Sequence, residues 1–310
     1  MNGKAPHLVQ YQGSKRILAP QILSFVDKEY DRFIEPFSGT AAMSIAMALD
    51  GKANSFLIND LNEPLILMLK EAIEEPNRLA SNYEKVWQEQ YRPELDGDHV
   101  KHFYEVRERF NAGARTPENM LYLLARVVKG AVRYDKNGVF NQSPDKRRHG
   151  TKPQTIKKNA LAISSLLKGK SIFSALSYEK VLEGAKASDL VYMDPPYQGV
   201  SFTRDHRYFA GVEVDDFARE LQVLNENDVD FIISYDGVCG EKSYGRDLPD
   251  SLRCTKVLLD AGRSAQATML GRKDVTLEGL YLSSGIAKRI DGSKLEETEY
   301  GLLYKYEARR

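Results

Sequence analysis

Near the start of the chain, short runs of apolar residues alternate with longer segments in which apolar and polar residues are mixed. Arg32–Pro36 has the pattern of a strand that ends in a turn, and the alanine-rich run after Gly39 has that of a buried helix. A second apolar strand over Ser55–Ile58 ends at Asn59-Asp60 and precedes a helix over about residues 62–75. This β-α-β-α order predicts a parallel sheet with its ligand site at the carboxyl ends of the strands.

The alternation stops after residue 76. Residues 77–170 are predicted to be mainly helical, as over Val100–Asn111 and Pro117–Lys129, and the polar stretch Tyr134–Phe140 carries the Asn-Gly signal of a tight hairpin. Strands are expected again over 171–173, 190–193, 231–234, 277–282 and 302–306, with a helix over about 214–225. The pattern predicts an α/β fold, a doubly wound and mostly parallel Rossmann-like sheet formed by residues 1–75 and 171–310. Residues 76–170 form a helical insert.

Composition is ordinary for a globular protein, with 42% hydrophobic and 28% charged residues in a chain of 310. The apolar runs are too short to span a bilayer, and Met1–His7 holds no apolar leader segment, so we expect a cytoplasmic protein without a membrane partner. The two cysteines, Cys239 and Cys254, are expected to be reduced thiols, and no metal site is expected.

Charge is distributed unevenly although the net charge is zero. From Arg126 to Lys170 there are twelve Lys and Arg residues against two acids, whereas Asp60 to Asp98 holds ten acids and four bases. A basic block within a neutral chain is typical of a local phosphate-binding surface. A solvated basic surface without a ligand explains the same pattern, and charge alone does not separate the two.

The sequence Asp194-Pro195-Pro196-Tyr197 directly follows a predicted apolar strand. Consecutive prolines fix φ and remove two N–H donors, so the turn is stiff and its carbonyl groups are free. The Asp194 carboxylate and the Pro195 carbonyl can then accept both hydrogens of one exocyclic amino group, while Tyr197 offers a face for stacking. Such a site acts by orientation and electrostatics, and it requires a base to be flipped out of a duplex. The alternative is a Pro-Pro turn capped by an aspartate.

Four blocks occur in one order: Gln10–Lys15, Glu35–Thr40, Asn59–Asn62 and Asp194–Tyr197. In this order they resemble the Dam-type, alpha-group DNA adenine-N6 methyltransferases of the D12 class. The resemblance covers nearly the whole chain, strongly in the four blocks and weakly in the insert. It implies methyl transfer from S-adenosylmethionine to adenine in a short target sequence of double-stranded DNA, by an enzyme that is a monomer or a weak dimer.

The resemblance also implies the residues that bind the cofactor. Glu35, Pro36, Phe37, Ser38 and Gly39 would cradle its methionine part, and Asp60 would bond the ribose hydroxyls. Further members of the expected site are Tyr11, Lys15, Ser177, Tyr178 and Asp194. The chain departs from the family at Ala41, where a second glycine is usual.

By resemblance the insert reads the DNA. The candidates for DNA contact are Arg126, Lys129, Arg133, Tyr134, Asn137, Asn141, Arg147, Arg148 and Lys152. Arg and Asn side chains have the geometry that reads purine edges, whereas Lys mostly holds phosphate. The polar loop Ser201–Tyr208 is long enough to close over a flipped base, and Tyr208 or Phe209 could take the place of that base in the stack.

Other functions remain open at this stage. An RNA amino-methyltransferase usually has its DPPY-like motif soon after the cofactor loop, unlike this chain, and N4-cytosine enzymes more often begin that motif with Ser. A non-catalytic DNA-binding relative is disfavoured by the intact Lys15, Asp60 and Asp194. A nicotinamide dehydrogenase is disfavoured because no Gly-x-Gly-x-x-Gly follows the first strand.

Overall fold

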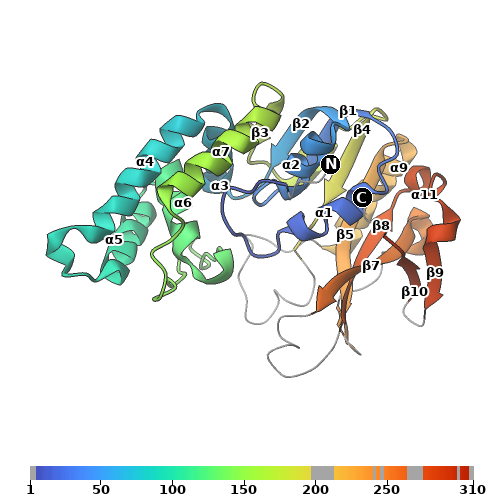
Figure 1. The fold of residues 1–310 in the computed structure, drawn as a ribbon. Coiled ribbons are helices and arrows are strands. Elements are labelled where there is room, and N and C mark those ends of the chain that lie inside the picture. Colours follow the sequence, from blue (N-terminus) through green and yellow to red (C-terminus); the bar gives the residue numbers. More distant parts are fainter. Residues whose placement is uncertain are drawn as a thin grey trace.

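Within the residues that the structure describes, a ten-stranded sheet organises the α/β part of the molecule (Figure 1). The computed structural model describes residues 5–196, 213–239, 242–244, 248–263, 275–298 and 301–306. The strands are β1 (Tyr30–Glu35), β2 (Ala53–Asn59), β3 (Ser171–Ser174), β4 (Asp189–Met193), β5 (Asp230–Cys239), β6 (Lys242–Tyr244), β7 (Thr255–Arg263), β8 (Val275–Leu282), β9 (Leu295–Thr298) and β10 (Gly301–Tyr304).

The strand order is β3-β2-β1-β4-β5-β8-β7-β10-β9, with β6 paired to β5. Strands β1 to β5 pair in parallel along this order, whereas β8 is antiparallel to both β5 and β7. The predicted parallel core is therefore confirmed. The chain moves outward from β1 to β2 and β3 and then returns to the other side of β1 for β4. This reversal makes the β1–β4 edge a topological switch point, where open α/β sheets bind ligands.

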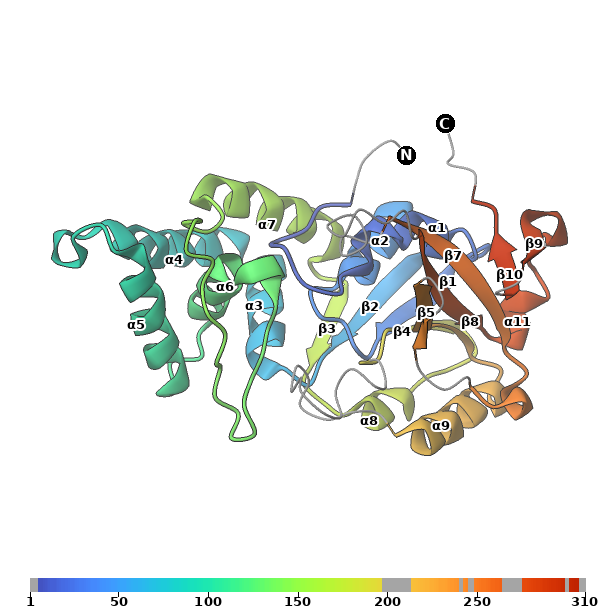
Figure 2. The same ribbon diagram turned by 90° about the horizontal axis from the view of Figure 1, so that it is seen from below.

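Helices cover both faces of this sheet. Figure 2 shows α1 (Ala19–Leu23) and α2 (Ala42–Asp50) on one face, and α8 (Tyr178–Leu182) and α9 (Val214–Glu226) on the other. Neighbouring residues of β1 enter different cores, because Phe33 belongs to one buried cluster and Ile34 to the other. A strand that is apolar on both faces is typical of a doubly wound sheet. The short helix α11 (Ser284–Ala287) follows β8.

The insert is helical, as predicted. After α3 (Glu63–Glu74) it contains α4 (Pro76–Gln88), α5 (His99–Asn111), α6 (Pro117–Arg126) and α7 (Pro153–Leu167). Three of these helices begin with proline, which suits the first helical turn because its N–H groups have no partner within the helix. Helix α3 packs on both α6 and α7, and α7 reaches α2, so the insert is tied to the sheet domain.

The expected hairpin is present between α6 and α7. Tyr134 and Phe140 form an antiparallel bridge, and the Asp135 amide donates to the Val139 carbonyl at 2.9 Å. The Asp135 carboxylate also accepts the amide hydrogens of Asn137 and Val139, at 2.8 and 3.0 Å. Gly138 lies at φ +73°, the left-handed position that closes a short hairpin loop. The hairpin descends from α6 in Figure 1.

Three further expectations concern the cysteines, a metal site and the membrane. The Cys254 thiol is free and half-buried, while the side chain of Cys239 lies outside the described residues. No group of side chains suited to hold a metal ion occurs in the described part of the chain. Among the helices of that part, none has the length and apolar content needed to cross a bilayer.

Candidate functional site

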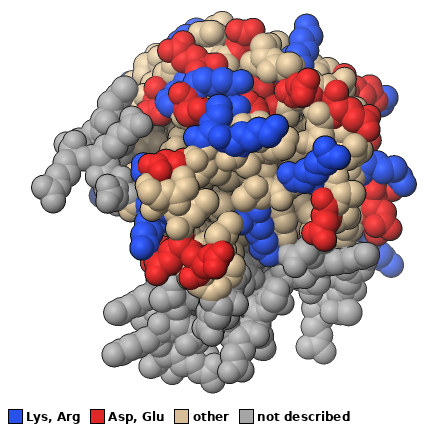
Figure 3. Space-filling view, turned by 90° about the vertical axis from the view of Figure 1, so that its right-hand side faces the viewer, with Lys and Arg blue, Asp and Glu red and all other residues tan. Residues whose placement is uncertain are grey.

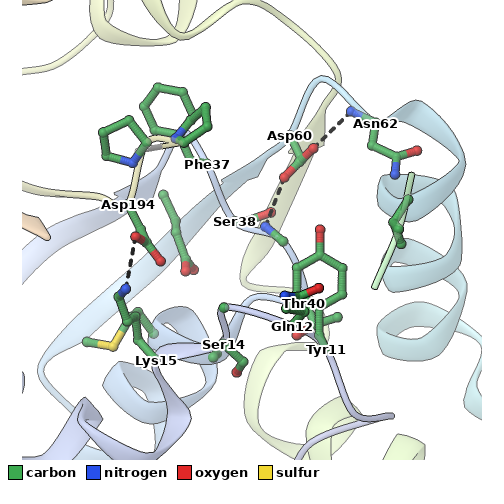
Figure 4. Close-up of a pocket in the computed structure, with 18 of the residues that line it drawn as sticks. Tyr11, Gln12, Ser14, Lys15, Phe37, Ser38, Thr40, Asp60, Asn62 and Asp194 are labelled. Atoms are coloured by element: carbon green, nitrogen blue, oxygen red, sulfur yellow. Dashed lines mark hydrogen bonds and ion pairs between the residues drawn. The ribbon is translucent and has the colours of Figure 1, made fainter. Parts of the chain in front are cut away.

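A pocket lies at the carboxyl ends of β1, β2 and β4, next to the switch point. The space inside it, including its open mouth, is about 1050 Å³. Its walls come from the N-terminal segment, from the loops after these strands and from the insert (Figure 4). The lining residues include Tyr11, Lys15, Glu35, Phe37, Ser38, Gly39, Thr40, Asp60, Asn62, Val132, Tyr134, Tyr192, Asp194, Pro195 and Pro196.

Glu35, at the end of β1, is buried against the first turn of α2. Its Oε2 accepts the amide hydrogen of Ser44 at 3.0 Å and also the Ser44 hydroxyl. Burial raises the pKa of Glu35 to about 8, although these hydrogen bonds favour the ionised form. The first N–H groups of a helix have no partner within the helix, so the start of α2 would otherwise suit a ligand carboxylate. The structure shows that the chain's own glutamate caps it.

The turn from β1 into α2 depends on two left-handed residues. Gly39 lies at φ +51°, and a Cβ atom at this position would be 2.8 Å from Cε1 of the Tyr11 ring. Ala41 lies at φ +56° with its side chain fully buried. Because a non-glycine residue in this region costs about 1–2 kcal/mol, the glycine that the family usually has at this place is explained by backbone geometry. Gly39 thus makes room for Tyr11, which forms part of the pocket wall.

Asp60 joins the loops that follow β1 and β2. Its Oδ2 accepts from the Gly39 amide and its Oδ1 from the Asn62 amide, both at 2.9 Å (Figure 4). Burial raises the pKa of Asp60, and the two backbone hydrogen bonds oppose this rise. Each carboxylate oxygen can accept further hydrogen bonds, so Asp60 can hold hydroxyl groups of a ligand while it fixes the loop.

Asn59 is a fully buried positioning residue to which the sequence motifs assigned no role. Its amide group donates to the carbonyls of Pro36 and Leu176, both at 2.9 Å, and accepts from Ser174 Oγ at 2.7 Å and Leu176 N at 2.9 Å. These bonds tie the loop after β1 to the loop after β3. An asparagine at a strand end next to Asp60 was the only signal for this role.

An ion-pair cluster lies on the opposite side of the pocket from Asp60. Lys15 Nζ is 3.2 Å from Asp194 Oδ1 and 2.8 Å from Glu278 Oε1 (Figure 4 draws the first of these pairs). Burial and the nearby Glu278 carboxylate raise the pKa of Asp194 to about 6, while Lys15 acts in the opposite direction. The structure therefore brings together Lys15 and Asp194, which the sequence predicted, and adds Glu278, which it did not.

Asp194, Pro195 and Pro196 directly follow the buried strand β4, and all three line the pocket. Tyr197 lies outside the described residues, as do the loop Ser201–Tyr208 and Phe209. The predicted turn is thus placed at the switch point by β4, beside Glu35 at the end of β1.

The insert supplies part of the pocket wall. Tyr134 is 6% exposed and its hydroxyl donates to Asn62 Oδ1 at 3.1 Å. Gly130 packs against the backbone of Gln10 and Tyr11 so closely that a Cβ atom would lie 2.1 Å from the Gln10 carbonyl oxygen. The Gly130 carbonyl also accepts the Gln12 amide at 3.1 Å. The N-terminal segment, the insert and the strand ends therefore enclose one pocket.

Ser177 and Tyr178 do not line this pocket. Tyr178 begins helix α8 and packs behind Phe37, with ring centroids 5.4 Å apart. It also contacts Phe217 of α9 at 5.7 Å between centroids. In this structure Tyr178 supports the ring of Phe37 and does not face the cavity itself.

The residues predicted to contact DNA differ in their exposure to solvent, and some of them are buried. Arg126 is fully buried, and its guanidinium donates to Gln90 Oε1 at 3.0 Å, the Tyr122 hydroxyl at 2.7 Å and His99 Nδ1 at 3.0 Å. Its burial contradicts the prediction that it contacts DNA. Tyr134 is buried in the pocket wall and Arg133 is half-buried, whereas the remaining candidates are exposed: Lys129, Asn137, Asn141, Arg147, Arg148 and Lys152.

The strand order, the helices on both faces and the pocket at the switch point define a Rossmann-like α/β protein with a pocket at the carboxyl ends of its strands. An acid at the end of β2, a glycine-containing turn after β1 and an Asp-Pro-Pro turn after β4 meet in that site. The chain belongs to the D12 class N6 adenine-specific DNA methyltransferase family, whose model matches residues 11–261.

Individual relatives agree with this family. The chain is 26% identical over 199 residues to the type II methyltransferase M1.LlaDCHI of Lactococcus lactis, and 27% identical over 197 residues to the retron Ec67 DNA adenine methylase of Escherichia coli. It is 26% identical over 221 residues to the type II methyltransferase M.MjaIII of Methanocaldococcus jannaschii. These matches cover 63%, 62% and 67% of this chain, and 66%, 61% and 74% of the relatives' own lengths.

Among solved structures, the rRNA methyltransferase aviRa from Streptomyces viridochromogenes matches with a TM-score of 0.35 and 12% identity, over 88% of this chain and 87% of that one. Because this TM-score is low, the fold class is assigned from the strand order and not from this structural match.

Proposed function

We propose that this chain transfers a methyl group from S-adenosylmethionine to N6 of a flipped-out adenine within a short target sequence of double-stranded DNA. The observation that carries the proposal is that Asp194 and Pro195 open into the same pocket as Gly39 and Asp60. The first two residues suit an amino group and the other two suit a nucleotide-like cofactor. Membership of the family supports both assignments.

The pocket fits a cofactor that carries both polar and apolar groups. The Ser38 hydroxyl is buried and has no hydrogen-bond partner among the described residues, although it lies in the pocket wall. Leaving a buried hydroxyl without a partner costs about 1–3 kcal/mol, so a polar ligand atom at this position would bind favourably. Asp60 would hold the ribose hydroxyls and Phe37 offers an apolar ring, while Lys15 and Tyr11 complete the wall.

The chemistry at the Asp-Pro-Pro turn is orientation of a weak nucleophile. The Asp194 carboxylate and the Pro195 carbonyl would accept the two hydrogens of the adenine amino group, which turns the nitrogen lone pair out of conjugation with the ring. S-adenosylmethionine, when bound, supplies an electrophilic methyl carbon on a sulfonium. The amino nitrogen forms a bond to that carbon while the carbon–sulfur bond breaks and its electron pair stays on sulfur. One proton then leaves the nitrogen for Asp194 or for water. Asp194 and Pro195 would thus lower the activation barrier mainly by positioning the amino group and by electrostatics.

A base within a duplex cannot reach a pocket at the end of β4, so the adenine must leave the helix at a cost of a few kcal/mol. Stacking on an aromatic side chain such as Tyr197 would offset part of this cost. The exposed polar and basic residues of the insert would bind the flanking DNA: Lys129, Asn137, Asn141, Arg147, Arg148 and Lys152. On the face at the end of the molecule opposite the insert, basic and acidic side chains are interspersed (Figure 3).

The deciding experiment is incubation of the protein with S-adenosylmethionine and plasmid DNA, followed by sequencing that detects modified bases. N6-methyladenine at one short sequence is expected, and N4-methylcytosine or modified RNA would refute the proposal. Asp194→Ala should abolish methyl transfer and leave the binding of S-adenosylmethionine largely intact, because Gly39 and Asp60 are unchanged. A crystal with the analogue sinefungin far from this pocket would also overturn the assignment.

A further inference from the structure

Glu278 is a partly buried acid in the ion-pair cluster and belongs to none of the sequence motifs. It lies on β8, its side chain is 13% exposed and its Oε1 is 2.8 Å from Lys15 Nζ. The hydroxyl of Ser234, a fully buried residue of the neighbouring strand β5, donates to the same oxygen. Two adjacent strands therefore fix the Glu278 carboxylate at the edge of the pocket, whereas the side chain of a surface glutamate would be free to rotate.

Lys15 lies between two acids that come from different parts of the fold. Its side chain is 9% exposed, and its ammonium contacts Asp194 Oδ1 at 3.2 Å in addition to Glu278. The ion pair of Lys15 with Asp194 is made through Oδ1 of that carboxylate. An ammonium that is held from one side by Glu278 cannot move across to engage both oxygens of Asp194.

We propose that Glu278 is a positioning residue for methyl transfer: by holding Lys15, it keeps one oxygen of Asp194 available to accept the amino hydrogen of the target base. The inference rests on the proposed function, because it assigns a role to Asp194 in the reaction. It also explains why an acid is placed beside a lysine that already has an acidic partner.

The electrostatics of the cluster point in the same direction. Burial and the Glu278 carboxylate raise the pKa of Asp194, whereas Lys15 lowers it. The Asp194 carboxylate in turn contributes to the raised pKa of Glu35. A carboxylate that is fully paired with an ammonium is a weaker hydrogen-bond acceptor for a substrate. Glu278 competes for the ammonium and thereby preserves the accepting strength of Asp194.

The test replaces Glu278 by the isosteric amide in Glu278→Gln. Lys15 then keeps Asp194 as its acidic partner within this cluster, so the pKa of Asp194 should fall by about one unit. The acid limb of the pH–rate profile should move to lower pH by the same amount. The value of kcat should fall about ten- to a hundredfold because the acceptor is misplaced, while KM for DNA changes little. Glu278→Asp, which keeps the charge, should return the acid limb toward its wild-type position.

A second readout does not depend on turnover. The carboxyl ¹³C signal of Asp194, assigned by its loss in Asp194→Asn, should titrate at lower pH in Glu278→Gln than in the wild type. The matched control is Glu297→Gln, the same chemical change at an exposed position of β9. This control should change neither the pH–rate profile nor the ¹³C titration of Asp194. The role of Glu278 is refuted if Asp194 in Glu278→Gln titrates like Asp194 in the wild type. It is also refuted if the acid limb of Glu278→Asp lies at the position found for Glu278→Gln, because the charge would then have no effect. A wild-type protein that does not methylate DNA would instead refute the proposed function, and the ¹³C titration would still decide whether Glu278 controls Asp194.

Discussion

The hydroxyl of Tyr134, in the insert, donates a hydrogen bond to Oδ1 of Asn62, 72 residues earlier at the start of α3. Asn62 in turn donates its amide to Asp60, and Asp60 accepts from Gly39. A single chain of contacts thus connects the hairpin that is proposed to meet DNA with the loops that are proposed to hold the cofactor. We therefore expect a displacement of the hairpin to change the position of Asp60.

Replacement of Tyr134 by Phe should weaken cofactor binding. The change removes the hydroxyl and leaves the buried Asn62 oxygen without this donor, at a cost of about 1–3 kcal/mol. Because Asn62 helps to fix Asp60, the dissociation constant of S-adenosylmethionine should rise about five- to tenfold, which calorimetry can measure. Tyr91→Phe, at a tyrosine of the insert that is 54% exposed, is the control and should bind normally. Unchanged affinity in Tyr134→Phe would show that this contact does not support the cofactor site.

The sequence predicted the core of the fold because burial on both faces leaves a local signal. Strands such as β4 are continuously apolar, and their ends are marked by polar residues such as Asp60 and Asp194. The alternation of strands and helices also predicted a ligand site at the carboxyl ends of the strands, and Asp60 and Asp194 line a pocket there. Strand β7 was missed because its sequence, Thr255–Arg263, mixes apolar with charged positions and is stabilised by pairing with β8 and β10.

Features that depend on distant partners could not be predicted. Arg126 lies in the basic block and was therefore assigned to the surface, yet Gln90 and His99, which come from earlier segments, surround its guanidinium. Glu278 had no signal either, because its importance comes from the approach of Lys15, more than two hundred residues away. Charge counted along a sequence does not distinguish a buried arginine from an exposed one.

Gly39→Ala should destabilise the protein more than an alanine at an unobstructed left-handed glycine. Both changes carry a backbone cost of about 1–2 kcal/mol, but Gly39 adds the 2.8 Å contact with the Tyr11 ring. Gly169 is a suitable control, since it lies at φ +72° and a Cβ atom added there would have nothing within 4 Å. Thermal unfolding should show a clearly lower Tm for Gly39→Ala than for Gly169→Ala. Equal losses would mean that the Tyr11 ring moves aside at no cost.

Stability should depend on pH through Glu35. Its pKa in the folded state, about 8, is above the ordinary value of 4.5, so the folded protein binds this proton more tightly than the unfolded chain. The stabilisation is complete below pH 4.5 and is lost as the pH rises through 8. Glu35→Gln resembles the protonated acid, so its Tm should fall less than that of the wild type between pH 5 and 8.5. Glu94→Gln, at an exposed position, should follow the wild type, and a parallel decline of all three proteins would exclude Glu35 as the source.

Neutralising Arg147 and Arg148 together should reduce the salt dependence of DNA binding. Both side chains are exposed at the end of the hairpin region, and each phosphate contact contributes about 0.9 to the slope of log K against log salt concentration. The double variant Arg147→Gln/Arg148→Gln should therefore lower the magnitude of that slope by about 2. Fluorescence anisotropy with a labelled duplex at several salt concentrations measures it directly. The matched control is Lys288→Gln/Lys294→Gln, two exposed lysines near α11 at the other end of the molecule. That control should retain the wild-type slope, and an unchanged slope in the arginine variant would remove both residues from the DNA interface.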